Sequence, residues 1–131
     1  MQDDKIDLFN TKAPGLFKRL SDDFGYVLDD IKIFEINNKN WSTKHIYLNN
    51  SKDLKIVIEQ APYYTDYGFT LFIYNLKLNE SNILYNLPHE KQDAEGNFIT
   101  TCCNEIFSSQ EILSFIKGEY WKNLNYIPVK K

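Results

Sequence analysis

The sequence predicts an α+β domain, in which an antiparallel sheet of about six strands is flanked by an N-terminal and a C-terminal helix packed on the sheet. Apolar residues follow a helical spacing near both ends of the chain and a strand-like pattern between residues 31 and 87. The connections between the expected strands are short, which favours antiparallel neighbours, because a parallel crossover needs a dozen or more residues. At 131 residues the chain has the usual length of one domain, so we expect a single globular domain over residues 1–131.

The first expected element is a short amphipathic helix from Pro14 to Phe24. Its apolar residues recur at spacings of three and four and are Leu16, Phe17, Leu20 and Phe24. We place Pro14 in the first turn, where its missing N–H is tolerated. Gly25 follows the last turn and can adopt the left-handed conformation that ends a helix.

The middle of the chain is rich in β-branched and aromatic residues that are separated by Asn, Ser, Asp and Gly. We expect strands near residues 31–37, 44–49, 53–60, 68–77, 82–87 and 97–103, with tight turns at residues 49–51 and 79–81. The alternation in the third strand predicts one face towards the core and one mostly towards water. The fourth strand is apolar on both faces, so we expect it to be central.

The last expected element is the C-terminal helix. Ser108 is followed three residues later by Glu111, a spacing that is typical of a capping box at a helix start. The broad apolar face that follows consists of Ile112, Leu113, Phe115 and Ile116. Gly118 is the expected terminator, and the helix is expected to pack on the sheet.

Composition and charge exclude some classes of partner. The 18 acidic and 15 basic residues give a formal net charge of −3, and no segment is basic enough to neutralise several phosphates. We therefore expect no nucleic-acid partner. No apolar run approaches the ~20 residues of a membrane span, and the first residues lack the features of a signal peptide. We expect no membrane insertion.

The two cysteines are adjacent, at positions 102 and 103, and cannot form a normal disulfide framework. This favours a reducing compartment, so we expect a cytoplasmic protein. The sequence contains no glycine-rich phosphate loop, dinucleotide fingerprint, nucleophile elbow or cysteine-based zinc pattern. We therefore predict no cofactor, and a non-enzyme is favoured over an enzyme.

The connection between the third and fourth expected strands carries an unusual group of aromatic residues. Large apolar groups on a loop are typical of a recognition surface, and an aromatic residue in the polar loop before the second strand could extend it. The candidate binding residues are Trp41, Tyr63, Tyr64, Asp66 and Tyr67. In the alternative interpretation, these rings fold over the sheet edge and contribute to the core.

The densest cluster of ionisable residues includes His89, Glu90 and Asp93, which are weak candidates for metal ligands. Their spacing matches no standard calcium or zinc site, so a solvated turn is the favoured interpretation. His45 is expected on the second strand as a surface or hydrogen-bonded residue. The two cysteines are expected on opposite faces of the sixth strand, with one buried and one partly exposed.

The leading functional hypothesis is a non-catalytic protein-binding domain, similar in size and charge to inhibitors and to toxin-neutralising immunity proteins. It rests on the missing catalytic motifs and on the aromatic, mildly acidic composition. The alternative is a small-molecule- or metal-binding domain, or a small enzyme, with a pocket between the sheet and the C-terminal helix. His45, His89 or a cysteine would serve that pocket.

Overall fold

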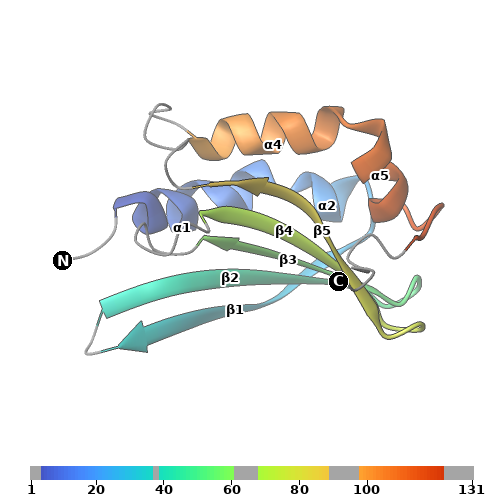
Figure 1. The fold of residues 1–131 in the computed structure, drawn as a ribbon, viewed down its shortest axis with the longest axis horizontal. Helices are drawn as coiled ribbons and strands as arrows, with labels where there is room; N and C mark the ends of the chain where they lie inside the picture. Colours follow the sequence, from blue (N-terminus) through green and yellow to red (C-terminus); the bar gives the residue numbers. More distant parts are fainter. Residues whose placement is uncertain (1–3, 37–38, 61–67, 89–97, 123–131) are drawn as a thin grey trace, which may run out of the picture.

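The computed structural model describes residues 4–36, 39–60, 68–88 and 98–122. These residues form two layers, a five-stranded antiparallel sheet and a layer of helices on one of its faces (Figure 1). The predicted α+β class is therefore confirmed, including the packing of N-terminal and C-terminal helices on the sheet. The helices are α1 (Asp4–Leu16), α2 (Arg19–Asp22), α4 (Phe98–Ser108) and α5 (Gln110–Ile116).

The N-terminal helical region begins earlier than predicted. Its buried stripe recurs at spacings of four, four and three and consists of Phe9, Ala13, Phe17 and Leu20. Pro14 lies in the last turn of α1 and not in a first turn, and the helix ends two residues later. The proline lacks a backbone donor, so it weakens the helix that contains it, and the chain resumes as the single turn of α2. The predicted helix from Pro14 to Phe24 is wrong in its bounds.

The strands are β1 (Val27–Ile36), β2 (Lys39–Asn49), β3 (Leu54–Gln60), β4 (Phe69–Asn75) and β5 (Glu80–Leu87). Each strand pairs antiparallel with the next, in the order β1-β2-β3-β4-β5. The middle strand is β3, whereas β4 lies beside the edge strand β5. The prediction that the fourth strand is central is confirmed in that β4 is paired on both sides, although it is not the middle strand.

The turn predicted at residues 49–51 is present and extends over residues 50–53. The turn predicted at 79–81 lies earlier, at residues 76–79, because Glu80 and Ser81 already belong to β5. In the turn between β2 and β3, the Asn49 side-chain oxygen accepts hydrogen bonds from the Ser51 hydroxyl at 2.8 Å and the Lys52 N–H at 3.2 Å. The last residue of each turn has a positive φ, which is 55° at Asp53 and 58° at Asn79. Asp and Asn tolerate this conformation better than most residues, because their short side chains bond to the local backbone.

The strand predicted near residues 97–103 is wrong, because residues 98–103 form the beginning of α4. The run Ile99, Thr100, Thr101 has local strand propensity. The buried residues of the segment nevertheless follow a helical spacing and are Phe98, Ile99, Cys102, Cys103, Ile106 and Phe107. Burial of this face against the rest of the core outweighs the weak local preference.

Helix α5 is capped one residue later than predicted. The N-cap is Ser109, whose hydroxyl accepts a hydrogen bond from the Ile112 N–H at 3.2 Å, whereas Ser108 is the last residue of α4. The helix ends as expected at Gly118, which has a φ of 76°. There the Glu119 N–H reaches the Ser114 carbonyl and the Gly118 N–H reaches the Phe115 carbonyl, both at 3.0 Å, which is a Schellman arrangement.

The core lies between the helices and the sheet. Aromatic rings join the two layers: Phe9 and Phe17 of the N-terminal region each lie 6.0 Å from the ring of Phe69 on β4. The Tyr26 hydroxyl donates to the Ile116 carbonyl at 2.7 Å and ties α5 to the start of β1. Among the described residues, no helix has the length and apolar character that a membrane span requires.

Candidate functional site

Most residues of the predicted sites lie outside the described residues. These are Tyr63, Tyr64, Asp66 and Tyr67 of the proposed recognition loop, and His89, Glu90 and Asp93 of the proposed metal cluster. The backbone of Trp41 is part of β2, so its placement in a loop is wrong, and its side chain also lies outside the described part.

His45 is a core residue. It lies opposite Ile58 on the helix-covered face of the sheet, its side chain is 1% exposed, and its ring centroid lies 4.6 Å from that of Phe9. Neither ring nitrogen has a hydrogen-bond partner among the described residues. Burial lowers the pKa of the imidazole to about 4, because the interior disfavours the charged form. His45 is therefore a neutral packing residue at ordinary pH, and the prediction of a surface or hydrogen-bonded residue is wrong.

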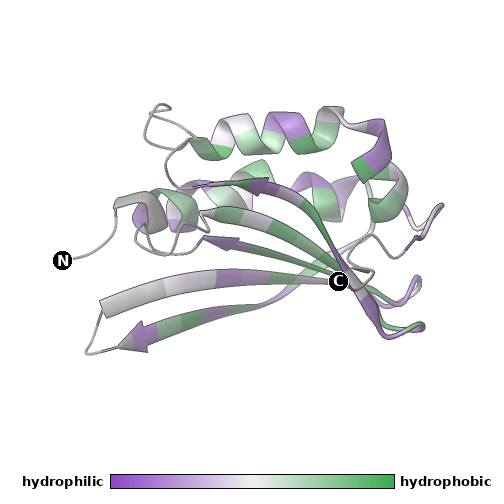
Figure 2. Cartoon of the chain, in the orientation of Figure 1, coloured by the Kyte–Doolittle hydropathy of each residue, from purple (hydrophilic) through white to green (hydrophobic). Residues whose placement is uncertain are grey.

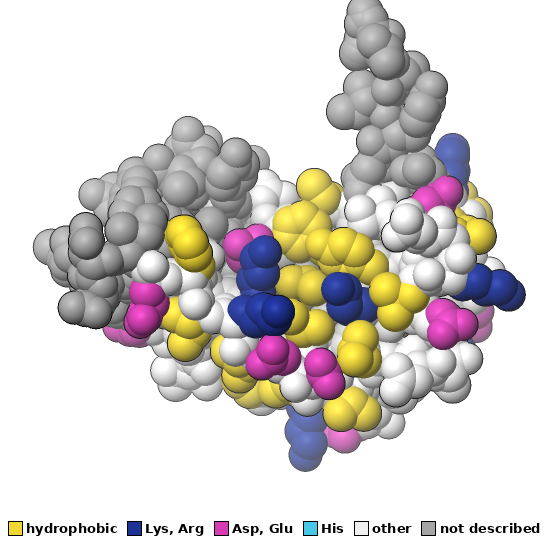
Figure 3. Space-filling model, turned by 90° about the horizontal axis from the view of Figure 1, so that it is seen from below, with side chains coloured by type: hydrophobic (Ala, Val, Ile, Leu, Met, Phe, Trp, Pro, Cys, Tyr) yellow, Lys and Arg dark blue, Asp and Glu magenta, His cyan; other side chains and the backbone are white. Residues whose placement is uncertain are grey.

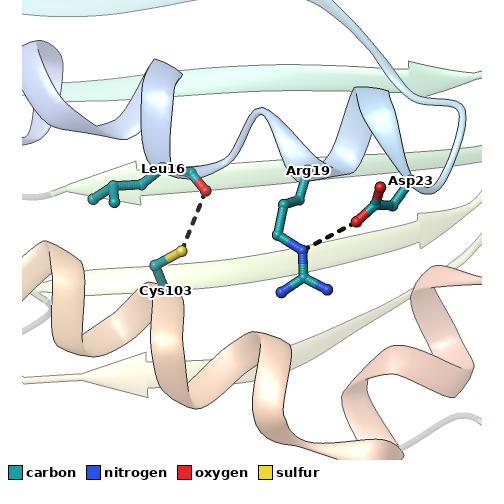
Figure 4. A network of polar contacts seen from close by, with 4 residues as sticks. All are labelled: Leu16, Arg19, Asp23 and Cys103. Atoms are coloured by element: carbon teal, nitrogen blue, oxygen red, sulfur yellow. Dashed lines mark hydrogen bonds and ion pairs between the residues drawn. The ribbon is translucent and has the colours of Figure 1, made fainter.

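Both cysteines are buried in α4, so the prediction of one partly exposed thiol on a strand is wrong. The Cys103 thiol donates to the Leu16 carbonyl at 3.2 Å, at the end of α1 (Figure 4). Burial raises the pKa of Cys102 to about 12 and also raises that of Cys103. A nucleophilic cysteine needs a lowered pKa and access to solvent, so the arrangement favours packing and not catalysis.

Arg19 illustrates how the few charges near the helices are used. Its guanidinium donates to the Asp23 carboxylate at 3.2 Å (Figure 4). The guanidinium carbon also lies 4.5 Å from the ring centroid of Phe107. Within the described part of the chain, no three His, Cys, Asp or Glu side chains are grouped to hold a metal ion.

A surface hollow of 380 Å³ lies near the end of α5. Its lining consists of Asp23, Phe24, Lys52, Lys117, Gly118 and Glu119. Acidic and basic groups are mixed there, and the Asp23 carboxylate is already bonded to Arg19. The hollow contains neither His45 nor a cysteine, so it does not provide the chemistry that a small-molecule site was expected to use.

The face of the sheet opposite the helices, which we call the open face, carries a continuous row of apolar side chains. Cross-strand pairing places Ile46, Val57, Phe72 and Ile83 side by side across β2 to β5. Directly opposite residues have Cβ atoms about 4.5–5.5 Å apart, so these four side chains form one surface. Val57 is 5% exposed at its centre and Ile83 is 48% exposed at its end. We call these four residues the apolar row.

Charged and aromatic residues border the apolar row. On one side, Lys55 lies opposite Tyr74, and its ammonium is 4.6 Å from the ring centroid. On the other side, Lys44 lies opposite Glu59. Burial raises the pKa of Glu59, while Lys44 acts in the opposite direction. Figure 3 shows apolar side chains gathered near the centre of this face, with basic groups among and beside them and acidic groups close by.

Sequence reasoning missed the apolar row. It predicted that the outer face of the third strand is mostly solvated, yet Val57 on that face is almost fully buried. The sequence did contain an indication of the row, because each of the strands β2 to β5 carries an apolar residue on its open face. It becomes a surface only when the register places those residues opposite one another.

Comparison with protein-family models found no match to this chain, and comparisons with curated proteins and with solved structures found no significant similarity. The open face therefore has to be interpreted from its own chemistry.

Proposed function

We propose that this protein is a non-catalytic protein-binding domain and that the open face of the sheet binds its partner. The observation that carries the proposal is the apolar row, an apolar centre bordered by charged groups. Stable protein interfaces have this arrangement, with an apolar core and a polar rim. An antiparallel sheet that faces water would instead carry polar residues along its open face.

The chemistry of the open face indicates what the partner presents. Lys55 is half-buried beside the row, and its ammonium lies over the Tyr74 ring without an ion pair to any described residue. A partly desolvated lysine gains from an opposing carboxylate. The proposed partner is therefore a protein whose contact surface has an apolar centre and an acidic group at its margin.

Two features argue against catalysis as the main role. The buried His45 and the two buried cysteines have pKa shifts that disfavour their charged forms, and each packs in the core. The open face offers Lys44, Lys55 and Glu59, which border apolar side chains on a sheet surface and do not converge in a cleft. Binding requires only complementarity at such a surface, whereas catalysis requires positioned reactive groups.

A variant series tests the proposal. Ile83→Asp places a charge in the apolar row and Lys55→Glu reverses the marginal charge, so each is expected to weaken the partner complex at least tenfold. Leu78→Asp is the matched control, because Leu78 is 53% exposed, close to the 48% of Ile83, but lies in the turn between β4 and β5. Affinity capture from the native lysate, with quantitative mass spectrometry, gives the readout.

The expected result is a stoichiometric partner that is retained by wild type and Leu78→Asp and lost by Ile83→Asp and Lys55→Glu. Circular dichroism and thermal melting confirm that the variants are folded. Equal capture by all four proteins, or no stoichiometric partner for wild type, would overturn the proposal.

A further inference from the structure

The edge strand β1 exposes an unusual amount of apolar surface. Five of the nine large apolar residues that are exposed among the described residues lie on this strand, with exposures between 38% and 65%. They are Val27, Leu28, Ile31, Ile33 and Phe34. A soluble protein normally protects a long apolar edge strand, because its free backbone groups attract another strand.

These residues are exposed on both faces of β1. Ile31 and Ile33 lie opposite His45 and Thr43, which are buried under the helices, yet both isoleucines remain about half exposed. The helices therefore leave this part of β1 exposed. Figures 1 and 2 show β1 as the strand farthest from α4, with hydrophobic residues along it. Phe34 lies on the open face, opposite Ser42.

The two edge strands of the sheet differ in their contacts with the rest of the chain. At β5, the Trp121 indole donates to Glu80 at 2.6 Å, the Asn82 amide donates to the Lys122 carbonyl at 2.8 Å, and the Tyr85 hydroxyl donates to Glu105. At β1, the Ile31 N–H is held by the carboxylate of its own neighbour, Asp30, at 2.8 Å. A side chain thus occupies a backbone donor that a paired strand would use.

The charges of β1 are complementary to a second copy of the same strand. In an antiparallel pair centred on Ile31, Asp30 of each copy lies opposite Lys32 of the other, and both belong to the open face. Centring on Asp30 or on Lys32 would oppose like charges, and centring on Ile33 would place Asp30 opposite Ile36. Opposite charges in cross-strand positions stabilise a pair, whereas like charges destabilise it. One register is therefore favoured.

The same register relieves a repulsion within one chain. Lys32 lies directly opposite Lys44 on the open face, and Lys44 in turn lies opposite Glu59. A second copy places its own Asp30 on the free side of Lys32. The row then runs acid, base, base, acid, so each lysine has an acidic neighbour.

We infer that β1 pairs with β1 of a second copy, with Ile31 at the two-fold axis, to form a dimer with one continuous ten-stranded sheet. On pairing, the Asp30 carboxylate moves from the Ile31 N–H to Lys32 of the other copy. The freed N–H then donates to the Ile31 carbonyl of that copy. This dimer uses the edge of the sheet and leaves both open faces available to partners, so it is independent of the proposed function.

Charge reversal tests the register. Asp30→Lys gives two lysines and Lys32→Asp gives two aspartates at the paired positions, so each variant alone is expected to dimerise at least tenfold more weakly than wild type. A mixture of the two variants restores both opposite-charge pairs and is expected to form a heterodimer. Sedimentation equilibrium over a micromolar to near-millimolar series measures all three states. Both residues are exposed, and melting curves confirm folding.

Cross-linking tests the axis directly. Ile31→Cys is expected to give a disulfide-linked dimer under mild oxidation, because position 31 of one copy lies opposite position 31 of the other. Ile33→Cys is expected to form no such disulfide, because position 33 lies opposite Asp29 of the other copy. The native cysteines are buried and do not interfere. A wild-type chain that stays monomeric throughout, a dimer indifferent to both charge reversals, or a mixture that forms no heterodimer would each overturn the inference. The open-face variants Ile83→Asp and Lys55→Glu leave this dimer unchanged.

Discussion

At the scale of single residues, His45 shows how the fold determines the chemistry of a side chain. In the sequence it stands in an ordinary strand between polar and apolar neighbours. In the structure it lies against Phe9 beneath α1, and burial makes its neutral form the stable one. No local pattern signals this, because the burial comes from a helix 36 positions earlier in the chain.

The low pKa of His45 makes stability depend on pH. The pKa is about 4 in the folded protein and 6.5 when unperturbed, so between these values the unfolded chain binds more protons. The contribution of His45 to stability is complete above about pH 6.5. It declines as pH falls towards 4, with a total loss on the order of 3 kcal/mol.

Denaturant unfolding of wild type and His45→Leu between pH 7 and pH 4 checks this prediction. Carboxylates contribute to acid sensitivity in both proteins, so the difference between the two curves isolates His45. The wild type is expected to lose stability more steeply over this range than the variant does. Parallel curves would show that the imidazole is not held neutral by the fold.

At the scale of secondary-structure elements, the junction of α4 and α5 shows where sequence patterns are ambiguous. Ser108 and Ser109 are both suitable caps, and the Ser108–Glu111 spacing favours the first. The structure uses Ser109, because α4 continues through Ser108 with Phe107 buried. The packing of the preceding helix decides which serine can cap the next one.

Replacing the cap gives an element-scale prediction. Ser109→Ala removes the acceptor of the Ile112 N–H and is expected to lower the free energy of unfolding by about 1 kcal/mol. For a chain of this size the melting temperature should fall by about 3–5 °C. Ser108→Ala is the control, and a smaller change, within about 0.5 kcal/mol, is expected for this exposed residue. A larger loss of stability for Ser108→Ala than for Ser109→Ala would instead support Ser108 as the N-cap, as the sequence predicted.

At the scale of the whole molecule, α4 contacts α1 and α5 and completes the core over the sheet. Its two thiols lie inside that core, one of them bonded to the Leu16 carbonyl. Their exposure therefore requires that the helical layer separate from its neighbours. Thiol reactivity becomes a measure of how cooperatively the two layers open.

Native protein is accordingly expected to react very slowly with an aromatic disulfide reagent at both cysteines. Sub-denaturing urea should accelerate both thiols together, as the free energy of opening falls. Cys102→Ala and Cys103→Ala, measured separately, assign each rate to one thiol. Rapid reaction of one equivalent in buffer alone would show that α4 opens locally and that the layers are not one cooperative unit.

Much of the architecture follows from the local pattern of this sequence. The strand-like middle, the turns before Leu54 and Glu80, the end of α5 at Gly118 and the antiparallel class depend on alternation, turn residues and short connections, which act over a few neighbouring positions. The errors at Pro14 and at Ile99 share one cause. At each of them, contacts between distant segments outweigh a weak local preference.

The surfaces on which the two proposals rest were decided only by the tertiary structure. The sequence by itself determined that Ile46, Val57, Phe72 and Ile83 are apolar and that Asp30 and Lys32 carry opposite charges. Register placed the first four in one row on the face away from the helices, where exposure rises from 5% at Val57 to 48% at Ile83, and the helices left the apolar residues of β1 exposed. A binding surface depends on which residues become neighbours, and neighbours from different strands are chosen by the folding of the whole chain.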